Sequence, residues 1–239
     1  MLIIAHRGGS IHAPENTFAA FDNALLMGAQ AFELDIRRSV DDMIFVIHDA
    51  TLDRTTNGSG PVGDTKSDII RSLDAGSWFS PAFLHEPVPL FEDVLMRYKD
   101  KATLHIEIKD DCRHLARLVA AKIQAAQAFE TCWVTSFHPD ALAELRACAP
   151  RVKMAQLTRK HQVWTPQSLL AAQVQMVCPH AQVVTKTLVD KYHAAGLLVR
   201  PWGLKGDAAL AETLNEFGVY GCTFSDLSTI KDRCGSTAK

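Results

Sequence analysis

The sequence predicts an α/β protein of the (β/α)8 TIM barrel class, with a small insertion subdomain after the second strand. Three observations carry this prediction. Eight short apolar runs recur along the 239 residues, segments with helical periodicity separate most of them, and the length suits one barrel domain. A doubly wound parallel sheet is the structural alternative. Eight regularly spaced repeats favour closure into a barrel instead.

The predicted strands are short apolar runs, several of which end in polar or charged residues. They cover residues 2–7, 31–36, 103–109, 132–137, 152–157, 175–179, 197–202 and 220–225. Between them, apolar residues recur three or four positions apart, as they do on one face of a helix. The segments that show this pattern best cover residues 15–28, 139–148, 185–196 and 207–217. Glycine or proline lies at the end of each, where a helix is expected to stop.

Two segments interrupt the alternation of strands and helices. Residues 37–48 are predicted to form a hairpin that turns at 40–42 and brings His48 back to the level of the preceding strand. Residues 51–100 form an insertion rich in Gly, Ser, Thr and Pro. Because no linker divides the chain, residues 1–239 are predicted to form one domain that contains this insertion.

Composition and charge exclude several classes of protein. The chain is 47% hydrophobic and 22% charged, so it can bury a core and is not disordered. Its net charge is −2 without a long basic run, so nothing indicates nucleic acid binding. No apolar stretch approaches the roughly 18 residues that span a bilayer. Residues 2–5 are too short for a secretory leader, so we expect a cytoplasmic protein. We also expect reduced thiols at the scattered cysteines 112, 132, 148, 178, 222 and 234.

Carboxylates follow two of the apolar runs, where active sites of (β/α)8 barrels lie. Glu33 and Asp35 are two residues apart, so they share one face of a strand, and the same holds for Glu107 and Lys109. Either pair alone is typical of an exposed or ion-paired strand. Three carboxylates at one barrel mouth repel one another, and a divalent cation would keep Glu33, Asp35 and Glu107 ionised. Oxygen ligands favour Mg²⁺, Ca²⁺ or Mn²⁺ over zinc.

Two histidines and two cations are predicted to adjoin these carboxylates. His6 ends the first strand, and His48 returns through the hairpin. Singly, such histidines are more often core or surface residues, but two imidazoles beside a reacting centre can act as general base and general acid. Arg7 is placed to bind an oxyanion through two N–H groups, with Lys109 as a second cation. Together these residues indicate an anionic substrate such as a phosphate ester.

In this order, these residues resemble the glycerophosphodiester phosphodiesterase family, from residue 3 to about residue 228. The matching segments are His6-Arg7-Gly8, Pro14-Glu15-Asn16-Thr17, Glu33-Leu34-Asp35, His48-Asp49, 52–58, 74–79, Glu107-Ile108-Lys109 and Ser136-Phe137. Two C-terminal segments depart from the family pattern. Trp202-Gly203-Leu204-Lys205 stands where the family usually shows Trp-Thr-Val-Asn, and Ser225-Asp226 where it usually shows Thr-Asp.

The resemblance implies a barrel with a small inserted subdomain after strand two, which corresponds to residues 51–100. The site that it implies consists of His6 and His48 as an acid–base pair, Arg7 and Lys109 as phosphate contacts, and Glu33, Asp35 and Glu107 as ligands of one divalent cation. The implied substrate is a small molecule, a glycerophosphodiester. Its hydrolysis would yield sn-glycerol 3-phosphate and an alcohol such as choline or ethanolamine.

Other functions stay open at this stage. A phospholipase-like or lysophospholipase D-like phosphodiesterase would keep the barrel and the cation, and an apolar rim, which is not visible in 51–100, would favour it. A catalytically silent barrel that binds phosphorylated ligands would be expected to lack a histidine or a carboxylate of this set, and all are present. A glycosidase with paired carboxylates would leave both histidines and Arg7 without a role. The oligomeric state is left open.

Overall fold

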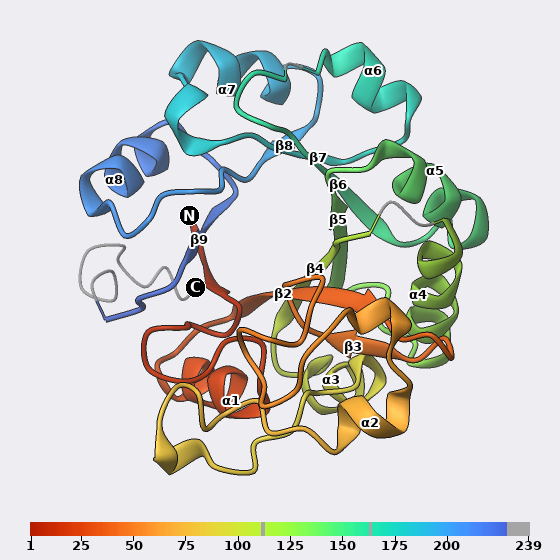
Figure 1. Ribbon diagram of the computed structural model, residues 1–239. Coiled ribbons are helices and arrows are strands. Elements are labelled where there is room, and N and C mark those ends of the chain that lie inside the picture. Colours follow the sequence, from red (N-terminus) through yellow and green to blue (C-terminus); the bar gives the residue numbers. More distant parts are fainter. Residues whose placement is uncertain (111–112, 163, 229–239) are drawn as a thin grey trace.

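The computed structural model describes residues 1–110, 113–162 and 164–228 and shows a ring of strands with helices around it (Figure 1). The strands of the ring are β1 (Leu2–His6), β2 (Ala31–Arg38), β4 (Thr103–Ile108), β5 (Cys132–Ser136), β6 (Lys153–Leu157), β7 (Met176–Cys178), β8 (Leu198–Val199) and β9 (Gly221–Phe224). They pair in parallel in the order β8-β7-β6-β5-β4-β2-β1-β9. The Tyr220 N–H donates to the Val199 carbonyl at 2.8 Å and links the two ends of this nearly closed ring. The predicted (β/α)8 barrel is confirmed.

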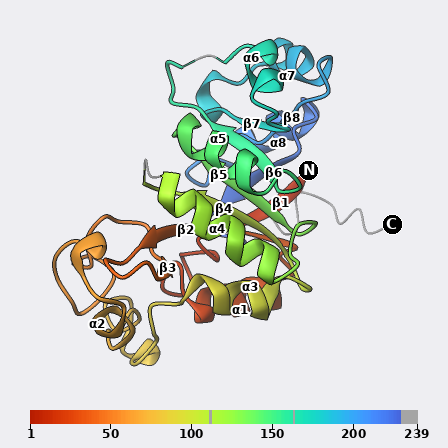
Figure 2. The same cartoon turned by 90° about the vertical axis from the view of Figure 1, so that its right-hand side faces the viewer.

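Helices follow the strands and pack against the outside of the ring (Figures 1 and 2). They are α1 (Phe18–Leu26), α3 (Phe91–Tyr98), α4 (Arg113–Ala125), α5 (Pro139–Cys148), α6 (Pro166–Ala171), α7 (Lys186–His193) and α8 (Ala208–Glu216). Apolar side chains of both layers form the main core, in which Phe21, Phe32 and Tyr98 pack ring against ring. Among the described residues, no helix combines the length and the apolar character needed to cross a membrane.

The first helix begins later than the sequence pattern predicts. Thr17 caps α1, and its hydroxyl oxygen accepts the Ala20 N–H. Asn16 has a φ of 59°, a left-handed backbone that no α-helix contains. The predicted start at residue 15 is therefore wrong, because residues 14–16 belong to the loop that leads into the site. The starts of α7 and α8 agree with the predicted segments 185–196 and 207–217 to within one residue. Thr185 and Asp207 are their N-caps.

Strand β8 is shorter than the predicted segment 197–202, although the pairing continues beyond it. The Arg200 N–H donates to the Val177 carbonyl and the Trp202 N–H to the Pro179 carbonyl, at 2.9 and 3.0 Å. Pro201 lies between these donors and has no N–H of its own. Residues 200–202 thus follow β7 up to the mouth of the barrel, and the loop after them starts at that level.

The hairpin predicted for residues 37–48 is confirmed. Strand β3 (Ile44–Val46) runs antiparallel to the end of β2, with Val46 opposite Ile36. Asp42 adopts a left-handed φ of 66° in the turn. Beyond β3 the Ile47 N–H donates to the Asp35 carbonyl at 2.9 Å. This hydrogen bond places His48 beside Asp35, although His48 ends no strand of the barrel.

Residues 51–90 form a separate layer that projects from one edge of the barrel and contains α2 (Ser67–Arg71) (Figure 2). Their small core includes Leu52, Val62 and Ile70, which pack with Phe45 of β3. Within the segment 51–100, the helix α3 instead joins the main core of the barrel. Cysteines 132, 148, 178 and 222 are reduced and form no disulfide among the described residues, while Cys112 and Cys234 lie outside the described residues.

Candidate active site

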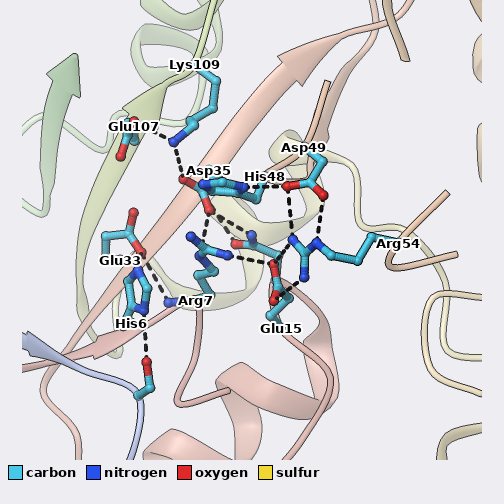
Figure 3. Close-up of polar contacts among 12 residues, drawn as sticks. His6, Arg7, Glu15, Glu33, Asp35, His48, Asp49, Arg54, Glu107 and Lys109 are labelled. Carbon is cyan, nitrogen blue, oxygen red and sulfur yellow. Dashed lines mark hydrogen bonds and ion pairs between the residues drawn. The ribbon is translucent and has the colours of Figure 1, made fainter. Parts of the chain in front are cut away.

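The seven side chains singled out in the sequence lie around one cavity at the C-terminal ends of the strands (Figure 3). The cavity has a volume of about 280 Å³. The seven residues are His6, Arg7, Glu33, Asp35, His48, Glu107 and Lys109. They come from β1, β2, β4 and the hairpin, which are neighbours in the ring. The structure therefore brings together every residue of the predicted site.

The register of three neighbouring strands brings the carboxylates together. His6 lies opposite Glu33 in the β1–β2 pair, and Asp35 lies opposite Glu107 in the β2–β4 pair. Oxygens of Glu33, Asp35 and Glu107 lie within 4.8 Å of one another, and these residues are only 4%, 1% and 9% exposed. Arg7 adopts a left-handed φ of 53°, and its backbone N–H donates to Glu33 Oε2 at 3.1 Å.

The three carboxylates are not equivalent. Burial and the negative charges of Asp35 and Glu107 raise the pKa of Glu33 well above its ordinary value. Burial and Asp35 also raise the pKa of Glu107. Burial alone would raise the pKa of Asp35, but Lys109 and Arg7 outweigh it and bring that pKa below its usual value. Burial and mutual repulsion thus disfavour full ionisation of the cluster. Three buried carboxylates that converge in this way fit a hard divalent cation, which would offset both effects.

Two cations lie against the outer side of this cluster. Lys109 Nζ donates to Glu107 Oε1 at 2.7 Å and lies 3.4 Å from Asp35 Oδ1. Arg7 Nε lies 3.3 Å from Asp35 Oδ2, and its Nη1 donates to Glu15 Oε1 at 2.9 Å. Arg7 Nε–H has no hydrogen-bond partner of good geometry within the described part of the chain. A buried donor without a partner is costly, and a substrate oxygen would satisfy it.

His6 lies between the carboxylate cluster and the last strand of the ring. Its Nδ1 is 3.0 Å from Ser225 Oγ and its Nε2 is 3.8 Å from Glu33 Oε2. Burial and the neighbouring Arg7 lower the pKa of His6 to about 4. The ring nitrogen toward Glu33 is close to the atoms that would hold a cation.

His48 has a carboxylate partner of its own. Its Nδ1 lies 2.6 Å from Asp49 Oδ1, so Nδ1 carries the proton in the neutral ring and Nε2 is left as an acceptor. Burial lowers the pKa of His48, while Asp35 and Asp49 oppose that change. The carboxylate of Asp49 is itself fixed, because Arg54 Nε donates to its Oδ2 at 2.6 Å.

A chain of ion pairs connects the two sides of the site (Figure 3). Arg54 donates to both carboxylate oxygens of Glu15 at 2.8 Å, and Glu15 accepts from Arg7. Burial would raise the pKa of Glu15, but its hydrogen bonds to Arg54 and the charge of Arg7 lower it. Arg54 is thus a fixed support for Glu15 and, through Asp49, for His48.

Sequence reasoning missed two residues of the site. Asn16 stands out in the sequence only as part of the segment 14–17, but its Nδ2 donates to Asp35 Oδ2 at 2.9 Å. Arg200 follows β8, is 1% exposed and lines the cavity. One feature of the sequence indicates a role for Arg200. An arginine inside the apolar run 197–202 needs buried negative charge nearby. Glu33 and Glu107 supply that charge across the barrel.

Fold and site together define a barrel enzyme whose mouth is suited to a cation and an anionic substrate. Residues 6–227 match the model of the Glycerophosphoryl diester phosphodiesterase family. The chain therefore belongs to this family, and the family assignment made from the sequence is confirmed.

Individual relatives agree with the family match. The glycerophosphodiester phosphodiesterase of Caldanaerobacter subterraneus subsp. tengcongensis is 33% identical over 96% of both chains. YhdW of Bacillus subtilis is 55% identical over 109 residues, which are 46% of this chain and only 45% of that relative. Among solved structures, the glycerophosphodiester phosphodiesterase of Agrobacterium tumefaciens has a TM-score of 0.88 and 31% identity, over 97% of this chain and 99% of its own. The Oleispira antarctica phosphodiesterase, in complex with the product sn-glycerol-3-phosphate, has a TM-score of 0.85 and 26% identity, over 97% and 96% of the two chains.

Proposed function

We propose that this protein hydrolyses glycerophosphodiesters to sn-glycerol 3-phosphate and an alcohol. The observation that carries the proposal is the convergence of three buried carboxylates and two histidines on one cavity, in a chain that belongs to a phosphodiesterase family. The product complex of the Oleispira antarctica relative supports sn-glycerol 3-phosphate as the molecule released.

Glu33, Asp35 and Glu107 would hold one divalent cation, Mg²⁺ or Ca²⁺, with Mn²⁺ also suited to oxygen ligands. The raised pKa values of Glu33 and Glu107 support this assignment, because a cluster without a cation favours protonation of these carboxylates. When bound, such an ion supplies a Lewis acid that withdraws charge from a phosphoryl oxygen.

Arg7 and Lys109 would bind the phosphate of the substrate. Lys109 has three N–H donors, and the structure shows one of them donating to Glu107. Arg7 keeps its Nε–H available, as described above. Both cations are fixed by carboxylates before the substrate arrives, so they lose little conformational freedom on binding.

His6 and His48 would transfer the protons. One imidazole, in its neutral form, removes the proton of the attacking hydroxyl as the new P–O bond forms. The other, which enters the reaction as imidazolium, donates its proton to the alcohol oxygen as the old P–O bond breaks. If water attacks, the products form in one step. If the neighbouring glycerol hydroxyl attacks, a cyclic phosphate forms first, and water then opens it with the two imidazoles in exchanged roles.

A coupled assay of glycerol 3-phosphate release tests the proposal. The assay uses several glycerophosphodiesters, with chelator treatment followed by return of Mg²⁺, Ca²⁺ or Mn²⁺. We expect release that stops on chelation and returns with metal. Absence of release from every diester would overturn the proposed function. Release that persists after the ion has been shown to be removed would overturn the metal assignment alone. A substrate that lacks the neighbouring glycerol hydroxyl separates the two routes, since only direct attack by water permits its hydrolysis.

A further inference from the structure

The side of the cavity that faces the carboxylate cluster contains groups that the proposed reaction does not use. In the ring order, β8 lies four places from β4, so the residues after β8 face the end of β4 across the barrel. Arg200 and the loop 203–206 line the cavity on this side. A phosphodiester whose phosphate lies at the cluster would extend one of its two alcohol groups toward this loop.

The backbone of the loop 203–206 has the form of an anion site. Gly203, Lys205 and Gly206 have left-handed φ values of 81°, 51° and 80°, while Leu204 between them does not. The alternation over 203–205 turns successive N–H groups toward one point, where they can bind an anion. None of the four N–H groups in 203–206 donates a hydrogen bond within the ranges that the structure describes. Gly203 is required here, because a Cβ would lie 2.8 Å from His180 Nε2.

Two positive charges accompany this loop. Arg200 is buried, lines the cavity, and its Nε–H has no partner among the described residues. Lys205 is exposed, lines the same cavity, and forms no ion pair with any residue that the structure describes. Lys205 therefore adds a positive charge to this part of the wall.

The rest of this wall is apolar and contains no compensating acid. Phe137 and Trp202 pack edge to face with ring centroids 5.4 Å apart and line the cavity beside the loop. The described lining residues from Phe137 to Gly206 include no Asp or Glu. Aromatic rings can attract a quaternary ammonium group, but Arg200 and Lys205 repel one. A cationic alcohol group would thus meet the uncompensated charge of Lys205 in this wall, beside Arg200, whose charge Glu33 and Glu107 offset from across the barrel.

We propose that the loop 203–206, with Lys205 and Arg200, binds a second phosphate group of the substrate. This inference rests on the proposed function and specifies its substrate class, namely glycerophosphodiesters whose alcohol part itself carries a phosphate. Cationic alcohol parts such as choline are disfavoured. The free N–H groups of the loop and the two cations match the oxygens of such a group.

Three diesters that differ in the charge of the alcohol test this assignment on the wild-type protein. They are glycerophosphocholine (cationic alcohol), glycerophosphoglycerol (neutral) and bis(glycerophospho)glycerol (phosphate-bearing). We expect kcat/KM to rise in that order, by about tenfold in total, and the preference to shrink as salt increases. A choline diester hydrolysed as well as bis(glycerophospho)glycerol would overturn the subsite and leave the proposed function intact. Failure to hydrolyse any of the three would overturn both.

Charge reversal at Lys205 provides the second test. Lys205→Glu is expected to lower the ratio of kcat/KM for bis(glycerophospho)glycerol over glycerophosphocholine by about tenfold. Lys205→Asn should lower this ratio of kcat/KM values less than Lys205→Glu does. Asparagine tolerates the left-handed backbone at position 205, so this variant tests the charge even if glutamate disturbs the loop. The control is Lys191→Glu, which makes the same change of net charge on the exposed face of α7. An unchanged ratio in both Lys205 variants would overturn the assignment.

Discussion

Asn16 and Asp35 exchange two hydrogen bonds. Asn16 Nδ2 donates to Asp35 Oδ2 at 2.9 Å, and the Asp35 backbone N–H donates to Asn16 Oδ1 at 3.3 Å. Both residues are buried, and the left-handed φ of 59° at Asn16 directs its amide from the loop before α1 toward β2. Since Asp35 is a proposed metal ligand, this pair fixes the carboxylate from outside the cluster.

Removal of the Asn16 amide is expected to weaken metal binding. Asn16→Gly keeps the left-handed backbone and deletes both hydrogen bonds, so the Asp35 carboxylate loses its fixed orientation. Loss of such a partner typically costs about 10–100-fold in metal affinity or activity. Titration of metal into chelated protein, followed by activity, measures the change. Asn23→Ala on α1 is the control. Unaltered metal dependence in Asn16→Gly would show that Asp35 needs no such support.

The two histidines are expected to be needed for turnover to a similar degree. His6→Ala and His48→Ala should each lower kcat by roughly 10²–10⁴-fold, because each removes one proton-transfer group. His114→Ala is a matched control, since this partly buried histidine pairs with Asp42 at 3.0 Å and is not among the residues that line the cavity. Glycerol 3-phosphate release under saturating substrate and metal measures kcat. Near-normal turnover in either variant would remove that histidine from the mechanism.

Much of the site could be predicted because its residues follow simple local rules. Glu33 and Asp35 share a face through the two-residue period of a strand, and the parallel register then places Glu107 opposite Asp35. His48 required one further step, the hairpin, whose turn residues were visible in the sequence. Each of these inferences uses spacing along the chain and the rule that parallel strands end at one edge.

The residues that could not be predicted depend on partners remote in the sequence. A local window shows Asn16 only as a polar residue before a helix, and its hydrogen-bond partner Asp35 lies on another element. Arg200 is tolerated in an apolar segment because carboxylates of β2 and β4 face it across the barrel. The proposed anion-binding form of the loop 203–206 depends on left-handed backbone angles. In the sequence, only Gly203 and Gly206 suggest such angles.

Metal binding is expected to stabilise the folded protein. An ion that binds only the folded state, at about 100 times its dissociation constant, adds roughly 2.7 kcal/mol. For a chain of this size, that corresponds to a rise in Tm of roughly 5–10 °C. Glu33→Gln should abolish the rise without lowering the Tm of the metal-free protein, because it relieves repulsion within the cluster. Thermal unfolding with and without Mg²⁺ or Ca²⁺ measures both, with Glu216→Gln on α8 as control. A full metal-induced rise in Glu33→Gln would exclude this residue as a ligand.

The insertion is expected to lose stability in acid through Asp74. Its Oδ1 accepts the N–H groups of Ser77 and Gly76 at 2.8 Å, and its Oδ2 accepts the His85 N–H at 2.6 Å. These hydrogen bonds lower the pKa of Asp74 from 3.8 to about 2. Because the folded-state pKa is the lower one, the stabilisation is complete above about pH 4 and is lost as the pH falls toward 2.

Asp74→Asn should therefore cost about 2 kcal/mol of unfolding free energy at pH 6, since bonds to a charged acceptor are lost. The difference in unfolding free energy between this variant and the wild-type protein should decrease progressively as the pH falls below 4. Urea unfolding of both proteins at several pH values measures this difference. The control is Asp64→Asn, at an exposed aspartate of the same insertion. A difference in unfolding free energy that stays constant between pH 6 and pH 3 would show that the charge of Asp74 contributes nothing. In that case only the shape of its side chain would stabilise the loop.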